Sequence, residues 1–244
     1  MMNPLSYWLT RFYVSIYVAV KNIFGFPWRP IKGVYMPLFP KIGFDTLRWI
    51  VNGRYEEGEI DIIQQKLSKT DRVMEIGAGL GFISTFCAKV AGSGNVFSFE
   101  ANPLNIQIAK LVYQKNKVLP NLQNALLSDS ECSIDFPINR KRLLASSLLK
   151  ASSESVKVPQ LNINEVIKDV KPTFLIMDIE GAEYDVIRIM QFQSIQKIQV
   201  ELHPAILGDV KIEEIFSILK TNGFIAEISI PDGRNYYFTR VPTI

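Results

Sequence analysis

Three alternating glycines follow a short apolar segment that carries one acidic residue. The segment spans residues 73–76 and includes Glu75, and Gly77, Gly79 and Gly81 come directly after it. Glycine lets the backbone turn sharply and approach a ligand without a Cβ in the way. A helix that starts near Gly81 offers free N–H groups and a partial positive charge, which suit an anionic group such as a carboxylate. These residues predict a strand–turn–helix site for the anionic part of a small ligand.

A second acidic residue, Glu100, ends the next apolar segment, 19 residues after Gly81. At the end of a second parallel strand, a carboxylate can accept hydrogen bonds from both hydroxyls of a ribose. The pyrophosphate-binding fingerprint requires glycine where this chain has Phe82, and the sequence has no Gly-Lys-Ser/Thr of a phosphate-binding loop. The two motifs therefore predict a nucleoside ligand without a pyrophosphate. The alternative interpretation is a plain glycine turn with an exposed Glu100.

Polar side chains that can move protons follow two later apolar segments. Asp178 and Glu180 come after the strand-like residues 174–177, and Glu201 and His203 follow the next such segment. The carboxyl ends of parallel strands meet at one edge of a sheet, where ligands bind. A histidine or carboxylate at that edge can take the proton of a hydroxyl nucleophile. A lone histidine can also be purely structural, so both interpretations of His203 stay open.

Five short motifs resemble known methyltransferases. The run Glu-x-Gly-x-Gly-x-Gly resembles motif I of the class I S-adenosylmethionine-dependent methyltransferases. Asp-Ile-Glu-Gly-Ala-Glu at 178–183 and Val-Glu-Leu-His at 200–203 resemble the FkbM family within that class. Phe-Glu-Ala-Asn-Pro at 99–103 and Tyr-Glu at 55–56 are also similar to that family. The resemblance covers about 53–240 and leaves residues 1–50 unexplained.

The resemblance implies S-adenosylmethionine as cofactor and methyl transfer to a hydroxyl of a sugar, a glycan or another small molecule. Where the family usually has Asp and Asn in the first motif, this chain has Glu75 and Gly79, a change that leaves cofactor binding intact. The cofactor-binding residues lie in the glycine loop and at strand ends: Glu75, Gly77, Ala78, Gly79, Gly81, Phe82, Glu100, Ala101, Asn102, Ala125, Leu126 and Asp178. The catalytic residues are Asp178, Glu180, Glu201 and His203.

Within this set, we expect Glu180 and His203 to activate the acceptor while Glu100 binds the cofactor. Glu183 is expected to be a first-turn carboxylate that faces the helix dipole. The carboxylates beside His203 could also bind a hard divalent ion, but no spacing rule demands one, and no metal ligand is predicted.

Alternating strands and helices must position these side chains. We expect strands at 72–76, 95–100, 121–127, 174–178 and 198–202, with a last hairpin of 224–230 and 235–240. Helices are expected at 56–67, 81–91, 103–117, 162–170, 182–190 and 211–222. An edge strand is expected at 132–136, and a loop insertion at 137–160 that contains Arg140, Lys141 and Arg142.

This order predicts a doubly wound, seven-stranded, mostly parallel α/β sheet, the Rossmann-like methyltransferase fold, which ends in an antiparallel β-hairpin. It forms a domain over residues 53–244. Specificity for the acceptor is expected in residues 29–55 and 130–160.

Residues 1–52 are expected to form an amphipathic helix and an extended arm or short hairpin. Apolar residues recur at helical spacing from Leu5 to Phe24, and prolines break the segment that follows. Two interpretations are open for the helix: it docks on its own domain or on a second subunit, or it makes peripheral membrane contact through residues 1–28. Arg11 and Lys21 leave too short an apolar run for a transmembrane span.

Charge and cysteine content narrow the class of protein. The net charge is +3, yet residues 1–44 contain five basic residues and no acid, so the remaining 200 residues carry −2. That balance, with no Asn-Pro-Pro-Tyr or Asp-Pro-Pro-Tyr motif after the 174–178 strand, speaks against a nucleic-acid partner.

Two cysteines favour a reducing compartment, and we expect a cytoplasmic protein with contact at the inner membrane face as an option. A nucleic-acid methyltransferase and a non-catalytic interaction module remain alternatives.

Overall fold

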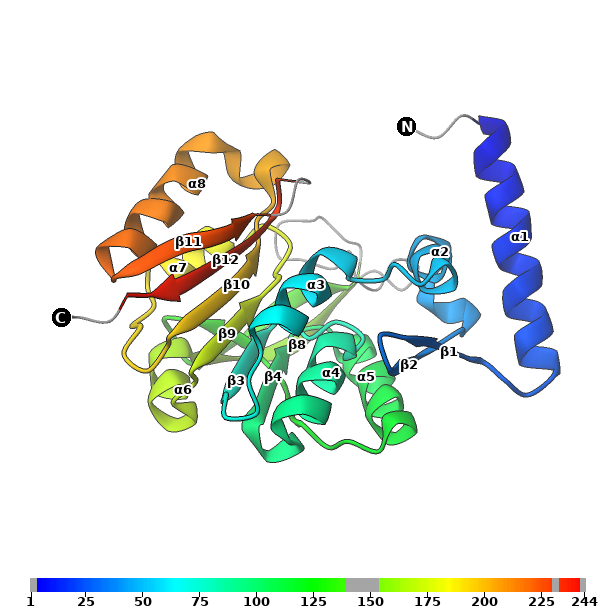
Figure 1. The fold of residues 1–244 in the computed structure, drawn as a ribbon, viewed down its shortest axis with the longest axis horizontal. Helices are drawn as coiled ribbons and strands as arrows, with labels where there is room; N and C mark the ends of the chain where they lie inside the picture. The colour runs from blue at the N-terminus through cyan, green and yellow to red at the C-terminus, as the bar shows by residue number, and fades with distance from the viewer. Residues whose placement is uncertain (1–3, 139–153, 230–232, 242–244) are drawn as a thin grey trace.

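The computed structural model describes residues 4–138, 154–229 and 233–241. A seven-stranded sheet forms the centre, with helices on both of its faces (Figure 1). In spatial order the strands are β11 (Phe224–Ser229), β12 (Asn235–Arg240), β10 (Lys197–Glu201), β9 (Phe174–Met177), β3 (Val73–Ile76), β4 (Val96–Glu100) and β5 (Asn121–Asn124). The five strands from β10 to β5 are parallel to one another, and β12 is antiparallel to both β10 and β11.

The helices divide between two hydrophobic clusters, one on each face of the sheet. One face carries α3 (Glu57–Lys66), α4 (Phe82–Ala91) and α5 (Pro103–Asn116); the other carries α6 (Ile163–Val170), α7 (Glu183–Ile187) and α8 (Pro204–Thr221). Successive strand residues point to opposite faces, so Val73 joins the first cluster and Met74 the second. The central strands β3 and β9 are buried along their whole length, as expected for parallel strands covered on both sides. The doubly wound sheet and its terminal hairpin are confirmed.

Two helices differ from the predicted ranges. The helix predicted at 182–190 is the shorter α7. The helix predicted at 211–222 begins earlier, because Pro204 occupies its first turn and Gly208, with φ +74°, joins two helical pieces across a kink.

The strand predicted at 121–127 divides at Ala125. The first part is β5, and the second, β6 (Leu126–Ser128), leaves the main sheet for a second one of order β6-β8-β7. Because the chain changes sheets at this point, Ala125 and Leu126 lie beside the ends of β4 and β5.

The loop predicted over 137–160 is partly wrong. Residues of β8 (Glu154–Asn162) pair antiparallel with β7 (Cys132–Ile138). Phe136, Ile138 and Val158 form a small buried cluster of their own, which provides the apolar face that this strand pair needs. Arg140, Lys141 and Arg142 lie outside the described residues.

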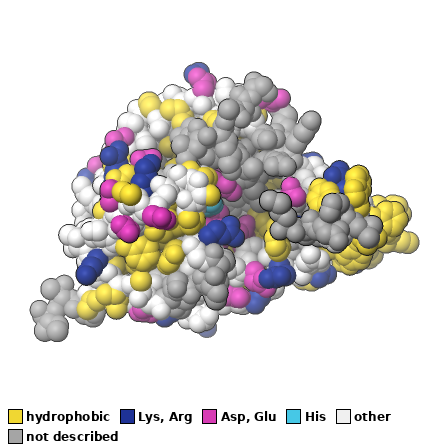
Figure 2. Space-filling view, turned by 90° about the horizontal axis from the view of Figure 1, so that it is seen from above, with side chains coloured by type: hydrophobic (Ala, Val, Ile, Leu, Met, Phe, Trp, Pro, Cys, Tyr) yellow, Lys and Arg dark blue, Asp and Glu magenta, His cyan; other side chains and the backbone are white. Residues whose placement is uncertain are grey.

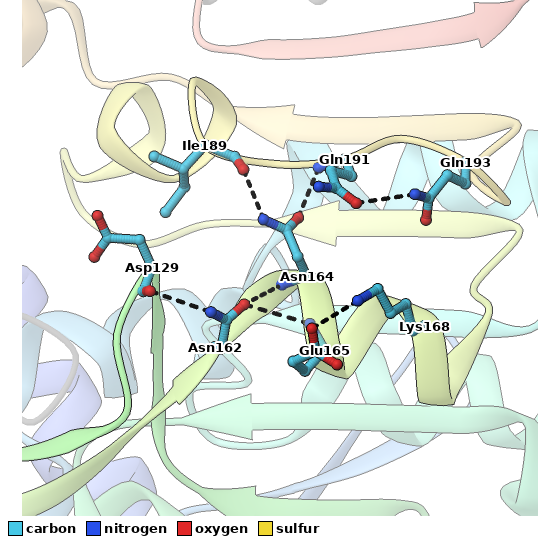
Figure 3. A network of polar contacts seen from close by, with 8 residues as sticks. All are labelled: Asp129, Asn162, Asn164, Glu165, Lys168, Ile189, Gln191 and Gln193. Carbon is cyan, nitrogen blue, oxygen red and sulfur yellow. Dashed lines mark hydrogen bonds and ion pairs between the residues drawn. The ribbon is translucent and has the colours of Figure 1, made fainter.

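Two asparagines connect the second sheet to the main domain (Figure 3). Asn162 accepts from the N–H of Asn164 at 2.9 Å, capping α6, and its amide donates to the Asp129 carbonyl. The Asn164 amide donates to the Ile189 carbonyl at 2.9 Å, and its oxygen accepts from Gln191 N–H at 2.7 Å. Asp129 and Ile189 both line the cavity described below, so this network holds two of its walls together.

The N-terminal segment packs against the α4–α5 side of the domain (Figure 1). It contains α1 (Pro4–Ile23), the hairpin of β1 (Trp28–Ile31) and β2 (Val34–Pro37), and α2 (Phe44–Asn52). The short hairpin confirms one of the two conformations expected there, whereas α2 was not predicted. The Asn116 side chain accepts from Tyr35 N–H at 2.8 Å and donates to the Tyr35 carbonyl at 3.0 Å, which anchors β2 to α5. Among the described residues, no helix is long and apolar enough to cross a membrane.

Candidate active site

A cavity of about 840 Å³ opens at the carboxyl ends of β3, β4, β9 and β10. Its lining includes ten of the twelve predicted cofactor-binding residues and all four predicted catalytic residues. The exceptions are Gly81 and Asn102. These two residues begin helices instead: Gly81 precedes α4 with φ +78°, and the Asn102 side chain accepts from Leu104 N–H at 3.0 Å to cap α5.

Gly77 is the tightest point of the glycine loop. Its φ of +93° disfavours any side chain, and an added Cβ would lie 1.7 Å from the Asp178 carbonyl oxygen. The N–H groups of Gly77 and Ala78 donate to the Phe99 carbonyl at 2.9 and 3.1 Å. The loop is therefore held between the ends of β4 and β9, and glycine at 77 is a requirement of that packing.

Both carboxylate oxygens of Glu100 are held by the backbone. One accepts from Gly79 N–H at 2.7 Å and the other from Asn102 N–H at 2.6 Å. Burial raises the pKa of Glu100 to about 7, although these backbone hydrogen bonds oppose the rise. The carboxylate is thus fixed in one orientation at the wall of the cavity, where a ligand hydroxyl can reach it.

Glu75 is the second buried carboxylate on this side. Its Oε1 accepts from Ser84 N–H at 3.1 Å, while Oε2 is buried without a hydrogen-bond partner. Burial raises its pKa to about 7. An orphaned buried oxygen at a cavity wall is an acceptor available to a bound ligand.

Ala78, Gly79, Phe82, Ala101, Ala125 and Leu126 complete this side of the lining. Phe82 packs edge-on against Tyr55, with ring centroids 5.6 Å apart. These side chains are mostly apolar, which suits a flat, largely apolar group such as a nucleobase.

His203 lies on the opposite side, at the start of α8. Its Nδ1 is 2.9 Å from Glu183 Oε1, and its Nε2 is 3.8 Å from Asp178 Oδ1. Glu183 is fully buried and also accepts from the N–H groups of Ile179 and Gly181. Because a carboxylate acceptor orients the proton to Nδ1, Nε2 is left as the basic nitrogen.

Opposing effects act on His203. Burial by itself lowers the pKa, but the hydrogen bond to Glu183 and the charges of Glu183, Glu180 and Glu201 together raise it above the ordinary histidine value. Glu183 therefore does more than face the helix dipole, although it does occupy the first turn of α7. Sequence reasoning missed this role; the one available signal was its three-residue spacing from Glu180 in the 178–183 motif.

Asp178 and Glu180 stand at the end of β9. Burial and then the charges of Glu201 and Glu56 raise the pKa of Asp178, and its Oδ1 is buried without a hydrogen-bond partner. Glu180 has φ +56°, a left-handed conformation that is uncommon for a residue with a side chain. This backbone turn between β9 and α7 directs the 178–183 segment toward the cavity.

A second group of carboxylates lies beside Asp178. Glu56, Glu59 and Glu201 each bring an oxygen within 4.8 Å of one another and of Asp178. Burial raises the pKa of Glu56 to about 7, and burial and the charge of Glu56 raise that of Glu59. Glu201 is also paired with Arg234 at 2.9 Å. A cluster of this kind can share protons or hold a hard divalent cation.

Glu56 and Glu59 were not among the predicted site residues. They belong to the start of α3, about 120 residues before Asp178 in the chain. In addition, Glu59 occupies an ordinary position in the amphipathic pattern of its helix. Nothing in its local pattern could have indicated the site.

The sequence model of the Methyltransferase FkbM domain matches residues 75–226. The match includes the glycine loop, Glu100 and the strand ends that carry Asp178 and His203. The chain belongs to the FkbM methyltransferase family. The FkbM match begins after Glu56 and Glu59, so the carboxylates of α3 come from outside the matched region.

Solved structures of two methyltransferases are similar to this FkbM protein. A methyltransferase from Pyrococcus furiosus is 11% identical and covers 94% of this chain and 96% of its own, with a TM-score of 0.50. The ribosomal protein L11 methylase of Lactobacillus delbrueckii subsp. bulgaricus is 15% identical over 78% of this chain and 81% of its own, with a TM-score of 0.48. Among curated proteins, no sequence matches the chain. At these identities the similarity concerns the fold alone.

Proposed function

We propose that this FkbM protein uses S-adenosylmethionine to methylate a hydroxyl of a sugar, a glycan or another small-molecule acceptor. One observation carries the proposal. A single cavity joins a backbone-fixed carboxylate, Glu100, to a histidine whose Nδ1 is held by the buried Glu183. Glu100 would bind a ribose, and His203 would remove a proton.

The residues of the β3–β4 side fit S-adenosylmethionine. Glu100 would accept hydrogen bonds from the ribose hydroxyls, and the apolar lining that includes Phe82 would enclose the adenine. The glycine loop and the N-terminus of α4 would receive the carboxylate of the methionine moiety. Glu75 Oε2 and Asp178 Oδ1, both buried without a hydrogen-bond partner, would accept from its amino group. When bound, the cofactor supplies a methyl group on a positively charged sulfur.

The β9–β10 side would prepare the acceptor. His203 Nε2 would take the proton of the acceptor hydroxyl while Glu183 keeps the imidazole in place and stabilises its charged form. Asp178 or Glu180 would orient the hydroxyl by accepting a hydrogen bond from it. Holding the two reacting atoms in line supplies much of the rate in such a displacement.

The remaining lining suits a polar acceptor. Ser128 and Gln160 come from the second sheet, and Asp129 directly follows β6. Arg188 follows α7, and Arg234 directly precedes β12. These groups offer both donors and acceptors, as recognition of a hydroxyl-rich molecule requires. They support a sugar-like acceptor over a purely apolar one.

The first experiment is calorimetric titration of S-adenosylmethionine into the wild type and into Glu100→Gln. We expect micromolar binding by the wild type and a loss of roughly 10- to 100-fold in the variant, since a hydrogen bond to a charged group contributes about 1.5–3 kcal/mol. The control is Glu213→Gln, the same change at an exposed position of α8. Equal affinity in all three proteins would remove Glu100 from the cofactor site, and no binding by the folded wild type would favour the non-catalytic module.

A second experiment addresses the acceptor. Hydroxylated compounds are incubated with methyl-labelled cofactor, with added magnesium or with a chelator. Transfer to sugars at equal rate in both conditions supports a reaction whose base is His203. Transfer that requires magnesium would assign the Glu56, Glu59, Asp178 and Glu201 cluster to a metal, and transfer only to nucleic acid would overturn the proposed acceptor class.

A further inference from the structure

Helix α1 has two faces with opposite environments. Val14 and Val18 are buried against the domain, and Asn22 donates from its amide to the Leu38 carbonyl at 2.9 Å. These contacts fix the helix beside α2 and the β1–β2 hairpin, at one end of the molecule (Figure 1).

The outward face of α1 is apolar along its whole length. Residues spaced three and four apart lie on one side of a helix, and those on the outer side are 44–79% exposed: Trp8, Leu9, Phe12, Ile16, Val20 and Ile23. Figure 2 shows the corresponding hydrophobic side chains gathered at this end of the molecule. A surface helix normally turns its apolar stripe to the core and its polar side to water. In α1 the exposed side is the more apolar one.

The segment that carries this apolar face is basic. Arg11 lies over the Phe44 ring at 5.5 Å, Lys21 lies over Tyr17 at 5.8 Å, and Lys41 is exposed on the neighbouring turn. No acidic residue occurs before Asp45. An apolar face bordered by positive charge is complementary to an anionic lipid surface, which attracts the cations and accepts the apolar side chains below its headgroups.

The same charges disfavour a second copy as the partner. A two-fold dimer would place the same surface of both chains in contact. The basic segment of one copy would then face that of the other, and like charges would repel. The exposed face is also a single projecting helix, which can enter a headgroup layer lengthwise.

We propose that α1 is a membrane-docking surface that inserts its outer face into the interface of an anionic bilayer. The outward face of α1, from Trp8 to Ile23, would lie among the lipid headgroups, and the cations beside it would contact lipid phosphates. This docking depends on no cofactor and on no acceptor, so it stands apart from the proposed methyl transfer.

The test is flotation of the full chain with vesicles of phosphatidylcholine alone or mixed with phosphatidylglycerol. We expect flotation with the anionic vesicles, weakened by added salt. The double variant Phe12→Ser/Ile16→Ser should bind at least about tenfold more weakly, because two large apolar side chains no longer enter the interface. The matched control is Leu119→Ser/Val210→Ser, two comparably exposed apolar residues elsewhere, which should float like the wild type.

Light scattering and melting temperature complete the test. An unchanged melting temperature of the α1 double variant shows that any loss of flotation comes from the surface. Equal flotation of the wild type and that variant would overturn the proposal. Flotation that is the same with and without phosphatidylglycerol in the vesicles would also overturn it. A dimer that forms without lipid and that the α1 variant dissociates, with no binding to vesicles, would assign the face to a second copy instead.

Discussion

The two sides of the cavity hold their carboxylates in different ways. On the β3–β4 side, Glu75 and Glu100 accept hydrogen bonds from backbone N–H groups in the glycine loop, in the first turn of α4 and just after β4. On the β9–β10 side, Asp178 meets Glu56, Glu59 and Glu201, which come from α3 and a neighbouring strand. The first side is built from one continuous βαβ unit, whereas the second is assembled from three separated segments.

This difference matches the two tasks of the proposed function. A site that always binds the same cofactor can be formed by local backbone geometry, because a turn places each N–H donor. A site that must remove a proton benefits from side chains with raised pKa values, and burial of several acids together produces them. The following predictions separate the two sides, from the largest expected effect to the smallest.

Gly77→Ala should damage the β3–β4 side most. The new Cβ would strain the backbone and would lie 1.7 Å from the Asp178 carbonyl oxygen. We expect binding of S-adenosylmethionine to fall below detection and the melting temperature to drop by about 5 °C or more. Gly94→Ala is the control, since its Cβ would enter open space. Comparable behaviour of the two variants in calorimetry and thermal melting would show that the loop is not held as described.

His203→Ala should affect only the β9–β10 side. Loss of a general base lowers turnover by roughly 10²–10⁴-fold, while the affinity for S-adenosylmethionine, measured by calorimetry, should change little. A parallel fall of affinity and turnover would contradict the separation of the two sides. Unchanged turnover would leave Asp178 or Glu180 as the base.

Glu183→Gln should shift the pH dependence of turnover. His203 acts as a base only when neutral, so turnover rises with pH through its pKa. In the wild type the hydrogen bond to Glu183 and nearby charges raise this pKa against the effect of burial, which places the acidic limb above the ordinary histidine value. The neutral amide should move that limb to lower pH and reduce maximal turnover by about tenfold.

Glu165→Gln, at an exposed ion pair with Lys168, is the matched control for this profile. It should leave both the limb and the maximum unchanged. A Glu183→Gln protein with reduced turnover but an unmoved limb would make Glu183 a packing residue and not a partner of the imidazole.

Glu59→Gln should stabilise the protein at alkaline pH. Burial, with the charges of Glu56 and Asp178, raises the pKa of Glu59 in the folded state. Such a carboxyl contributes stability below its unfolded pKa and loses that contribution as the pH rises through the folded pKa. The amide removes the loss, so the melting temperature should rise by a few degrees at about pH 8 and stay nearly constant at about pH 5.

Asp61→Asn, on the exposed side of the same helix, removes a surface pair with Lys32. Because exposed pairs contribute about 0–1 kcal/mol, its melting temperature should change little at either pH. If Glu59→Gln were destabilising at both pH values, its carboxylate would be a needed hydrogen-bond partner of Gln199.

The amino-acid sequence by itself determined the doubly wound sheet, the hairpin and the β3–β4 side of the site. Residue periodicity, the glycine spacing and the acid at the end of each strand are local features, and local features can be seen in sequence. The strand β8 escaped prediction, because its partner strand lies about 20 residues away and its apolar cluster is small. The sequence predicted Glu183 as a first-turn acid. Its contact with His203 joins α7 to α8 and therefore could not be predicted from local features.

Only the tertiary structure decided which face of α1 is buried and which acids surround Asp178. An amphipathic pattern shows that a helix has an apolar side, yet α1 is apolar on both sides. Of its described side chains, Val14 and Val18 are buried in the core and Tyr17 packs against it. Glu56 and Glu59 join the site because α3 packs against β10 and β12. Contacts of this kind depend on how whole elements pack, and no spacing along the chain encodes them.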